Sequence, residues 1–259
     1  MWTAGVWTAL VLSSLIGLSL GLVGGGGSIV TVPILVYVAG LPPREAIALS
    51  LPIVGATAAL GAILQARSGN VHAKAAAIYG VMGMMGAVGG ARLTALVPPS
   101  VLMMLFAALM VVVGWRMARG RDETETPQKV ECNFPKCALT GLGLGVMTGF
   151  LGVGGGFLLV PALLRFTHMP MRQAVGTSLA IIAANSAAGF LAHLGDVRDG
   201  LPLALAFTIA AIAGLGVGTW LSRHLKPAGL KTAFGGLSLA VAAYLIAMNI
   251  QPLMKLVAR

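Results

Sequence analysis

A glycine-rich stretch that occurs twice decides the fold of this chain. The first copy, GLVGGGGSIVTVP, covers residues 21–33, and the second copy, GFLGVGGGFLLVP, covers residues 149–161. Shifting the sequence by 128 residues superposes the two copies and aligns the two halves without a gap. The same shift places Pro42 on Pro170, Ser50 on Ser178, Gly86 on Gly214 and Phe106 on Phe234. A register that holds over most of each half indicates an internal repeat.

The composition indicates which solvent surrounds the repeats. Of 259 residues, 58% are hydrophobic and only 9% are charged, whereas ordinary soluble domains carry roughly 25% charged residues. The 36 glycines suit closely packed helices. The 17 Lys and Arg residues are spread between apolar runs, so they are interpreted as orientation signals and not as a nucleic-acid surface. The composition therefore predicts an all-α polytopic membrane protein.

Each half contains five apolar segments. They cover residues 5–23, 28–41, 46–66, 74–93 and 101–117 in the first half, and residues 138–151, 156–167, 173–194, 201–221 and 230–249 in the second. A helix that crosses a membrane needs about 20 residues, so the second and seventh segments are short. They either cross as tilted or broken helices, or each forms a re-entrant hairpin with the segment before it.

Counting Lys and Arg predicts the orientation. With the N-terminus outside, 12 of these residues fall on the inside and 5 on the outside, which favours both termini outside the cell membrane. An odd number of net crossings per half then inverts the second repeat, an architecture common in secondary transporters. The predicted domains are a first transmembrane repeat (1–118), a charged cytoplasmic linker (119–136) and a second, inverted transmembrane repeat (137–259).

The two glycine-rich turns are the first candidate substrate site. Backbone N–H groups in such turns form a concave nest for an anion, and the short helix that follows adds the positive end of its dipole. Tight helix packing is the alternative explanation, and it is favoured for Gly83, Gly86, Gly89 and Gly90. The candidate ligands are Gly24, Gly25, Gly26, Gly27 and Ser28 in the first turn, and Gly152, Val153, Gly154, Gly155 and Gly156 in the second.

The third and eighth segments each carry one polar stripe. Its members are Ser50, Thr57, Gly61 and Gln65 in the first half, and Ser178, Asn185, Gly189 and His193 in the second, with Thr177 beside them. At about 100° per residue each set falls on one helix face. These hydroxyls and amides either line an anion path or hydrogen-bond neighbouring helices.

The charged residues suggest how an anion would pass. All seven acids lie in loops or at segment edges, whereas proton- and sodium-coupled carriers usually place a carboxylate within a span. Arg44 and Arg172 occupy equivalent places on opposite sides, as attractors for anions or as plain interfacial anchors. The candidates for gating or coupling are Arg44, Arg172, Gln65 and His193. Cys132 and Cys137 are interpreted as incidental loop residues, and neither a metal site nor an enzyme signature is recognised.

The motifs resemble those of the TauE/SafE sulfite exporter-like permeases. The resemblance rests on GxxGGGG, VP and AxxxSL in the first half, and on GxxGVGGGxxxVP and AVGTSL in the second, and it covers nearly the whole chain. It implies a plasma-membrane permease of bacterial type for small sulfur-containing anions, such as sulfite or organosulfonates. The family pattern falls on residues 24–28, Pro33, Ser50 and Leu51, and on residues 152–156, Pro161, Thr177 and Ser178. Leu49 stands where the second half has Thr177, so the two half-sites are chemically unequal.

The leading hypothesis is a secondary transporter that exports such an anion by alternating access between the repeats, without a cofactor. Export of a monoanion from an inside-negative cell is downhill by about 2.3 kcal/mol per 100 mV. Three alternatives stay open: a coupled importer of this or another small anion, an anion channel, and a membrane protein that does not transport. The expected partners are the small anion and the lipid bilayer, with no nucleic acid.

Overall fold

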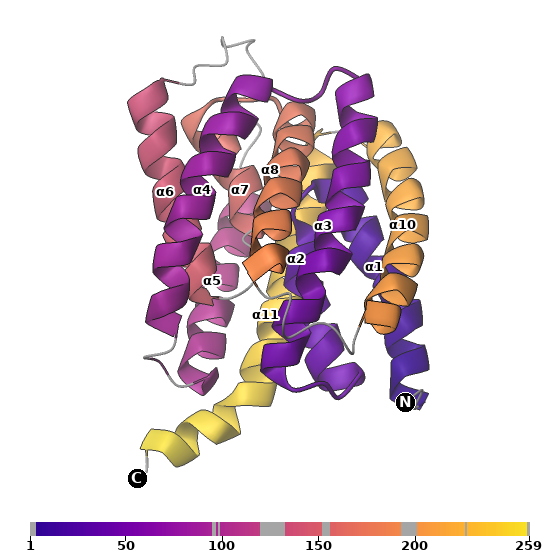
Figure 1. Ribbon diagram of the computed structural model, residues 1–259, viewed down its shortest axis with the longest axis vertical. Coiled ribbons are helices and arrows are strands. Elements are labelled where there is room, and N and C mark those ends of the chain that lie inside the picture. The colour runs from indigo at the N-terminus through magenta and orange to yellow at the C-terminus, as the bar shows by residue number, and fades with distance from the viewer. Residues whose placement is uncertain are drawn as a thin grey trace.

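The computed structural model describes residues 4–94, 97, 99–119, 133–151, 156–192, 201–225 and 227–257. Within these ranges the chain forms ten α-helices and one π-helical turn, with no strand, so the all-helical prediction is confirmed (Figure 1). The elements are α1 (Ala4–Val23), α2 (Gly26–Pro33), η1 (Ile34–Val38), α3 (Pro43–Arg67), α4 (Ala73–Thr94), α5 (Pro99–Arg119), α6 (Phe134–Leu151), α7 (Gly156–Phe166), α8 (Met171–Ala192), α10 (Leu201–His224) and α11 (Pro227–Val257).

The ten predicted apolar segments coincide with the ten α-helices, because long apolar runs and their Gly and Pro boundaries are local properties of the sequence. Four helices of the described chain are long and apolar enough to cross a membrane: Glu45–Arg67, Met171–Leu191, Pro202–Ser222 and Ala228–Met248. Shorter apolar helical stretches cover Trp7–Val23, Ile29–Val38 and Met104–Met117.

Helix α1 ends at the first glycine-rich turn, where the chain changes direction. Gly24 has a φ of +72°, in the left-handed region that favours glycine, and its N–H donates to the carbonyl of Leu20 at 2.8 Å. The eight-residue α2 runs into η1, where the N–H of Ala39 donates to the carbonyl of Ile34 at 3.0 Å. Neither α2 with η1 nor the 11-residue α7 reaches the length of a full span. In Figure 1, α3 begins at the same end as α1, which both a re-entrant hairpin and a pair of crossings would require.

Four helix pairs form the body of the bundle. They are α4 with α6, α1 with α10, α5 with α11, and α3 with α8. Glycines allow the first two pairs to approach closely: a Cβ on Gly86 would meet the backbone of Leu142, and a Cβ on Gly214 would meet the backbone of Ser14. Tight packing therefore explains Gly86, but not Gly89, which has no neighbouring atom within 4 Å.

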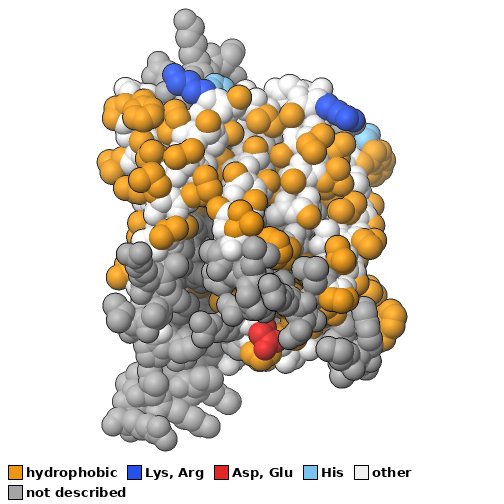
Figure 2. All heavy atoms as spheres, in the orientation of Figure 1, with side chains coloured by type: hydrophobic (Ala, Val, Ile, Leu, Met, Phe, Trp, Pro, Cys, Tyr) orange, Lys and Arg blue, Asp and Glu red, His pale blue; other side chains and the backbone are white. Residues whose placement is uncertain are grey.

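The largest buried side chains are aromatic and stand at corresponding positions of the two halves. Tyr79, Phe106, Phe207 and Phe234 are the four largest fully buried side chains of the described residues. The shift of 128 residues places Tyr79 on Phe207 and Phe106 on Phe234. The outward faces of the helices carry exposed apolar side chains, such as Met85 on α4, and these cover much of the surface in Figure 2. An apolar exterior of this kind suits a lipid surround.

The described charged side chains lie at the two ends of the bundle. In Figure 2, blue Lys and Arg side chains lie at the upper end and a red acidic side chain lies at the lower end. Glu45, in the first turn of α3, is the acid that falls within the described residues. Helix α1 begins, and α11 ends, at the lower end of Figure 1.

The interpretation of Cys137 as incidental is wrong. Its side chain is buried near the start of α6, with 1% exposed, and it is disulfide-bonded. The sequence does not indicate this bond, because two cysteines five positions apart make no recognisable framework. The other cysteine of the sequence, Cys132, lies outside the described residues.

Candidate functional site

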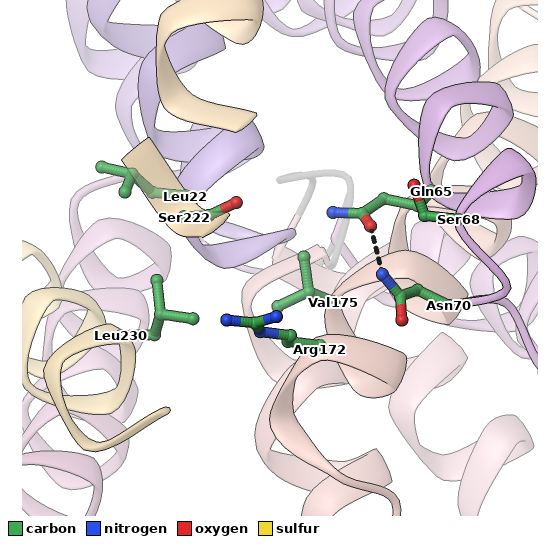
Figure 3. A pocket seen from close by; sticks show the side chains of 8 residues that line it. All are labelled: Leu22, Gln65, Ser68, Asn70, Arg172, Val175, Ser222 and Leu230. Atoms are coloured by element: carbon green, nitrogen blue, oxygen red, sulfur yellow. Dashed lines mark hydrogen bonds between the residues drawn. The ribbon is translucent and has the colours of Figure 1, made fainter. Parts of the chain in front are cut away.

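A cavity of about 350 Å³ lies where five helices meet at the upper end of the bundle (Figure 3). Helices α1, α3, α8, α10 and α11 contribute to its wall, together with the loop between α3 and α4. The lining residues are Leu22, Gln65, Ser68, Asn70, Arg172, Val175, Ser222 and Leu230. The wall thus combines one guanidinium with two amides, two hydroxyls and three aliphatic side chains.

The polar groups of the cavity converge from different helices. Figure 3 shows the guanidinium of Arg172, the amide nitrogen of Gln65 and the hydroxyl of Ser222 pointing into the same space. The Ser222 hydroxyl donates to the carbonyl of Thr219 at 2.8 Å, so a rotation about its side-chain bond would let it donate to a ligand instead. The lining residues that the structure describes include no carboxylate. A wall with one fixed positive charge and several neutral donors suits a small anion.

Helix α8 adds to the positive character of the cavity. Arg172 and Val175 belong to its first two turns, where the N-terminal end of a helix carries partial positive charge. The acid of the described chain, Glu45, begins α3, whereas the cavity includes Gln65 near the end of the same helix. A span of α3 therefore separates that carboxylate from the cavity.

The first glycine-rich turn is attached to α8 rather than standing free. The Ser178 hydroxyl donates to the carbonyl of Gly24 at 2.8 Å, and also lies 2.8 Å from the carbonyl of Val175. A Cβ on Gly24 would lie 2.7 Å from the carbonyl oxygen of Val175. Gly27 packs against Leu20 of α1. These contacts engage the N–H and the carbonyl of Gly24, so an anion nest in this turn would have to use the following amides. That role stays a prediction.

The remaining candidates in this turn and its counterpart are only partly described. Gly25 precedes α2, and Gly26 and Ser28 lie in its first turn. Gly156 is buried at the start of α7. Gly152, Val153, Gly154 and Gly155 lie outside the described residues, and so does His193.

Thr177 holds the loop between α3 and α4. Its Oγ1 accepts a hydrogen bond from the backbone N–H of His72 at 3.0 Å, and its side chain is fully buried. The neighbouring Gly176 lies so close to the carbonyl of Asn70 that a Cβ would not fit. The consecutive residues Gly176, Thr177 and Ser178 therefore connect α8 with two segments of the first half.

The polar stripes do not all reach the cavity. Ser50 and Thr57 donate at 2.7 Å to carbonyls of their own helix, those of Ile47 and Ile53. Asn185 lies beside Gly83 of α4, and a Cβ on that glycine would be 3.2 Å from its Nδ2. The Oδ1 of Asn185 and the Oγ of Ser186 are buried without a hydrogen-bond partner. Such atoms are costly in an apolar surround unless water or a ligand reaches them.

The structure brings together two of the predicted candidates, Gln65 and Arg172, in one cavity. Arg44 lies in the first turn of α3, at the other end of the bundle. Sequence reasoning missed Ser68, Asn70 and Ser222 as lining residues. The polar loop after Gln65 gave a signal for Asn70, but no pattern in the sequence relates Ser222 to this site. Among the described residues, no three His, Cys, Asp or Glu side chains come together to hold a metal ion.

Comparison with known proteins gives a consistent result. The family described as "Sulfite exporter TauE/SafE" matches residues 9–245. A "Probable membrane transporter protein" of Xylella fastidiosa (strain 9a5c) is 38% identical over 245 residues, which cover 90% of this chain and 91% of that protein. The "Probable membrane transporter protein YdhB" of Bacillus subtilis (strain 168) is 23% identical over 225 residues, covering 85% of this chain and 91% of that protein. No solved structure matches the chain.

The family match covers most of the chain, and so do the relatives. Both describe transporters, which agrees with the prediction that the chain is not an enzyme. The long apolar helices agree with a protein that crosses the membrane several times. The chain therefore belongs to the TauE/SafE family of membrane transporters.

Proposed function

We propose that the protein is a secondary permease that exports small sulfur-containing anions, such as sulfite or organosulfonates, by alternating access. The cavity around Arg172 is the observation that carries the proposal. One guanidinium surrounded by neutral donors can bind an anion of low charge and still release it. The positive-inside rule favours the upper end of Figure 1 as cytoplasmic, so the cavity would load from the cell interior. Both termini would then lie outside.

The helix pairing supports a pair of inverted repeats as the moving parts. Under the 128-residue shift, the pair α4–α6 corresponds to α10–α1, while α3–α8 and α5–α11 each correspond to themselves. Gly61 faces Leu179, and its equivalent Gly189 faces Leu51, the equivalent of Leu179. Reciprocal contacts of this kind are expected from a two-fold relation between the halves. Rocking of one repeat against the other would open the site to each side in turn.

The first test is flux through purified protein in liposomes, with an imposed membrane potential and no proton or sodium gradient. We expect saturable flux of sulfite or methanesulfonate that follows the potential. Within the described spans the one carboxylate, that of Glu45, stands at the first residue of its span, and none lies in mid-span to bind a coupling ion. Flux that appears only after a proton or sodium gradient is added would favour the coupled importer instead. Flux that does not saturate would favour a channel.

A second expectation concerns Asn185. Its buried Oδ1 has no hydrogen-bond partner, which favours a water-filled path at this point of α8, and its Nδ2 could donate to an anion on that path. Asn185→Leu should lower the transport rate by about tenfold while the yield of folded protein stays within about twofold. The amide supplies donors to a passing anion but contributes only about 0.6 kcal/mol to helix packing. Equal losses of transport and of folded protein would assign Asn185 to helix packing alone.

A further inference from the structure

Asn70 fixes the direction of a neighbouring amide in the cavity wall. Its Nδ2 donates to Oε1 of Gln65 at 2.9 Å. Because the Oε1 of Gln65 accepts this hydrogen bond, the Nε2 of the same amide points away from Asn70. In Figure 3 the nitrogen of Gln65 points into the cavity. The direction matters because an amide nitrogen donates hydrogen bonds and an amide oxygen accepts them.

Both members of this amide pair are held in place. Gln65 is buried, with 8% of its surface exposed, and it lies in the last turns of α3. Asn70 belongs to the loop that α8 holds through the hydrogen bond from His72 to Thr177 and through the close contact of Gly176. The N–H of Asn70 also donates to the carbonyl of Gln65 at 2.9 Å. The wall therefore presents a preorganised donor opposite α8.

We propose that Gln65 is a specificity-determining ligand of this cavity and that Asn70 is its positioning residue, so that the site selects oxyanions over halide ions. The inference rests on the proposed function. The guanidinium of Arg172 attracts any anion, but donors from α3 and α8 together favour an anion with oxygens in several directions. A sulfonate group has three such oxygens, whereas chloride has a single centre.

This amide pair belongs to one half of the chain only. The equivalent positions in the second half are His193 and Arg198 instead of Gln65 and Asn70. The neutral donor pair is therefore a feature of the cytoplasmic cavity under the proposed orientation. Recognition of the oxyanion would take place where an exporter loads its substrate.

The test compares equilibrium binding of methanesulfonate and chloride to the purified full-length protein. Both anions carry a single charge, so the selectivity ratio, which is the dissociation constant for chloride divided by that for methanesulfonate, isolates recognition of shape. Gln65→Met keeps the length of the side chain and removes its donors. We expect methanesulfonate binding to weaken by about tenfold, the size of one hydrogen bond to a charged group, and chloride binding to stay within about twofold of the wild type. Gln173→Met is the matched control, because Gln173 follows Arg172 but does not line the cavity.

The positioning role is tested with Asn70→Ala. It should lower the ratio in the same direction as Gln65→Met, and the double variant should bind no more weakly than Gln65→Met, since both changes act through one bond. Additive losses would overturn the positioning role. An unchanged ratio in Gln65→Met would overturn the inference even if Asn70→Ala fails to fold. If Arg172→Gln abolishes binding while Gln65→Met keeps the ratio, this inference alone fails. If the wild type binds neither anion, the proposed function fails with it.

Discussion

Arg172→Gln is expected to weaken anion binding by roughly 10- to 100-fold and to reduce flux at low anion concentration by a similar factor. A hydrogen bond to a charged group contributes about 1.5–3 kcal/mol, and each 1.4 kcal/mol corresponds to about tenfold in affinity. Among the described residues that line the cavity, Arg172 is the one that carries a formal charge. Glutamine keeps the polarity and much of the length of the side chain but removes that charge.

The design of this experiment separates an anion ligand from an interfacial anchor. Arg172→Lys should recover part of the affinity, because it keeps the charge but loses the planar donor fork. Arg165→Gln is the control, because Arg165 is exposed in the last turn of α7, shortly before α8, and does not line the cavity. The measurement is the dissociation constant for methanesulfonate at constant ionic strength. Equal effects of Arg165→Gln and Arg172→Gln would assign both residues to interfacial anchoring.

Gly214→Val is expected to cause a large loss of folded protein. A Cβ at this position would contact the carbonyl oxygen of Ser14 and lie 2.7 Å from its carbonyl carbon and 3.0 Å from the backbone nitrogen of Leu18. These are backbone atoms of α1, so they cannot turn away as a flexible side chain could. The helices α1 and α10 would have to separate, and overpacking costs about 1–3 kcal/mol or more.

A neighbouring glycine of the same helix provides the control. Gly216 is exposed and has no atom within 4 Å of a built Cβ, so Gly216→Val should leave yield and thermal stability unchanged. In the other half, Gly86→Val should repeat the loss and Gly89→Val should not, because Gly86 faces the backbone of Leu142 and Gly89 faces no atom. Size-exclusion profiles and melting temperatures of the four variants in detergent provide the measurement. Equal behaviour of Gly214→Val and Gly216→Val would contradict the packing explanation.

The first glycine-rich turn illustrates how much of the local structure can be predicted from residue type alone. At Gly24 the sequence predicts a break, and a positive φ is found there, because few residues other than glycine adopt that conformation. The sequence does not indicate that Ser178 of the other half donates to the carbonyl of Gly24. Ser178, which the sequence suggests as a substrate ligand, therefore also has a structural role. That role depends on which backbone carbonyl the fold brings near its hydroxyl.

The sequence by itself determined where the helices of the described chain lie and that α1 ends at the first glycine-rich turn. Apolar runs, Gly and Pro act on the backbone over a few residues, so their effects can be predicted from the sequence without knowledge of the tertiary contacts. Only the tertiary structure decided which polar residues meet. Gln65 and Arg172 come from different halves, and Ser222 comes from a third helix, yet all three face one cavity. Such convergence depends on how the helices cross and rotate in the bundle, which the packing of all of them fixes together.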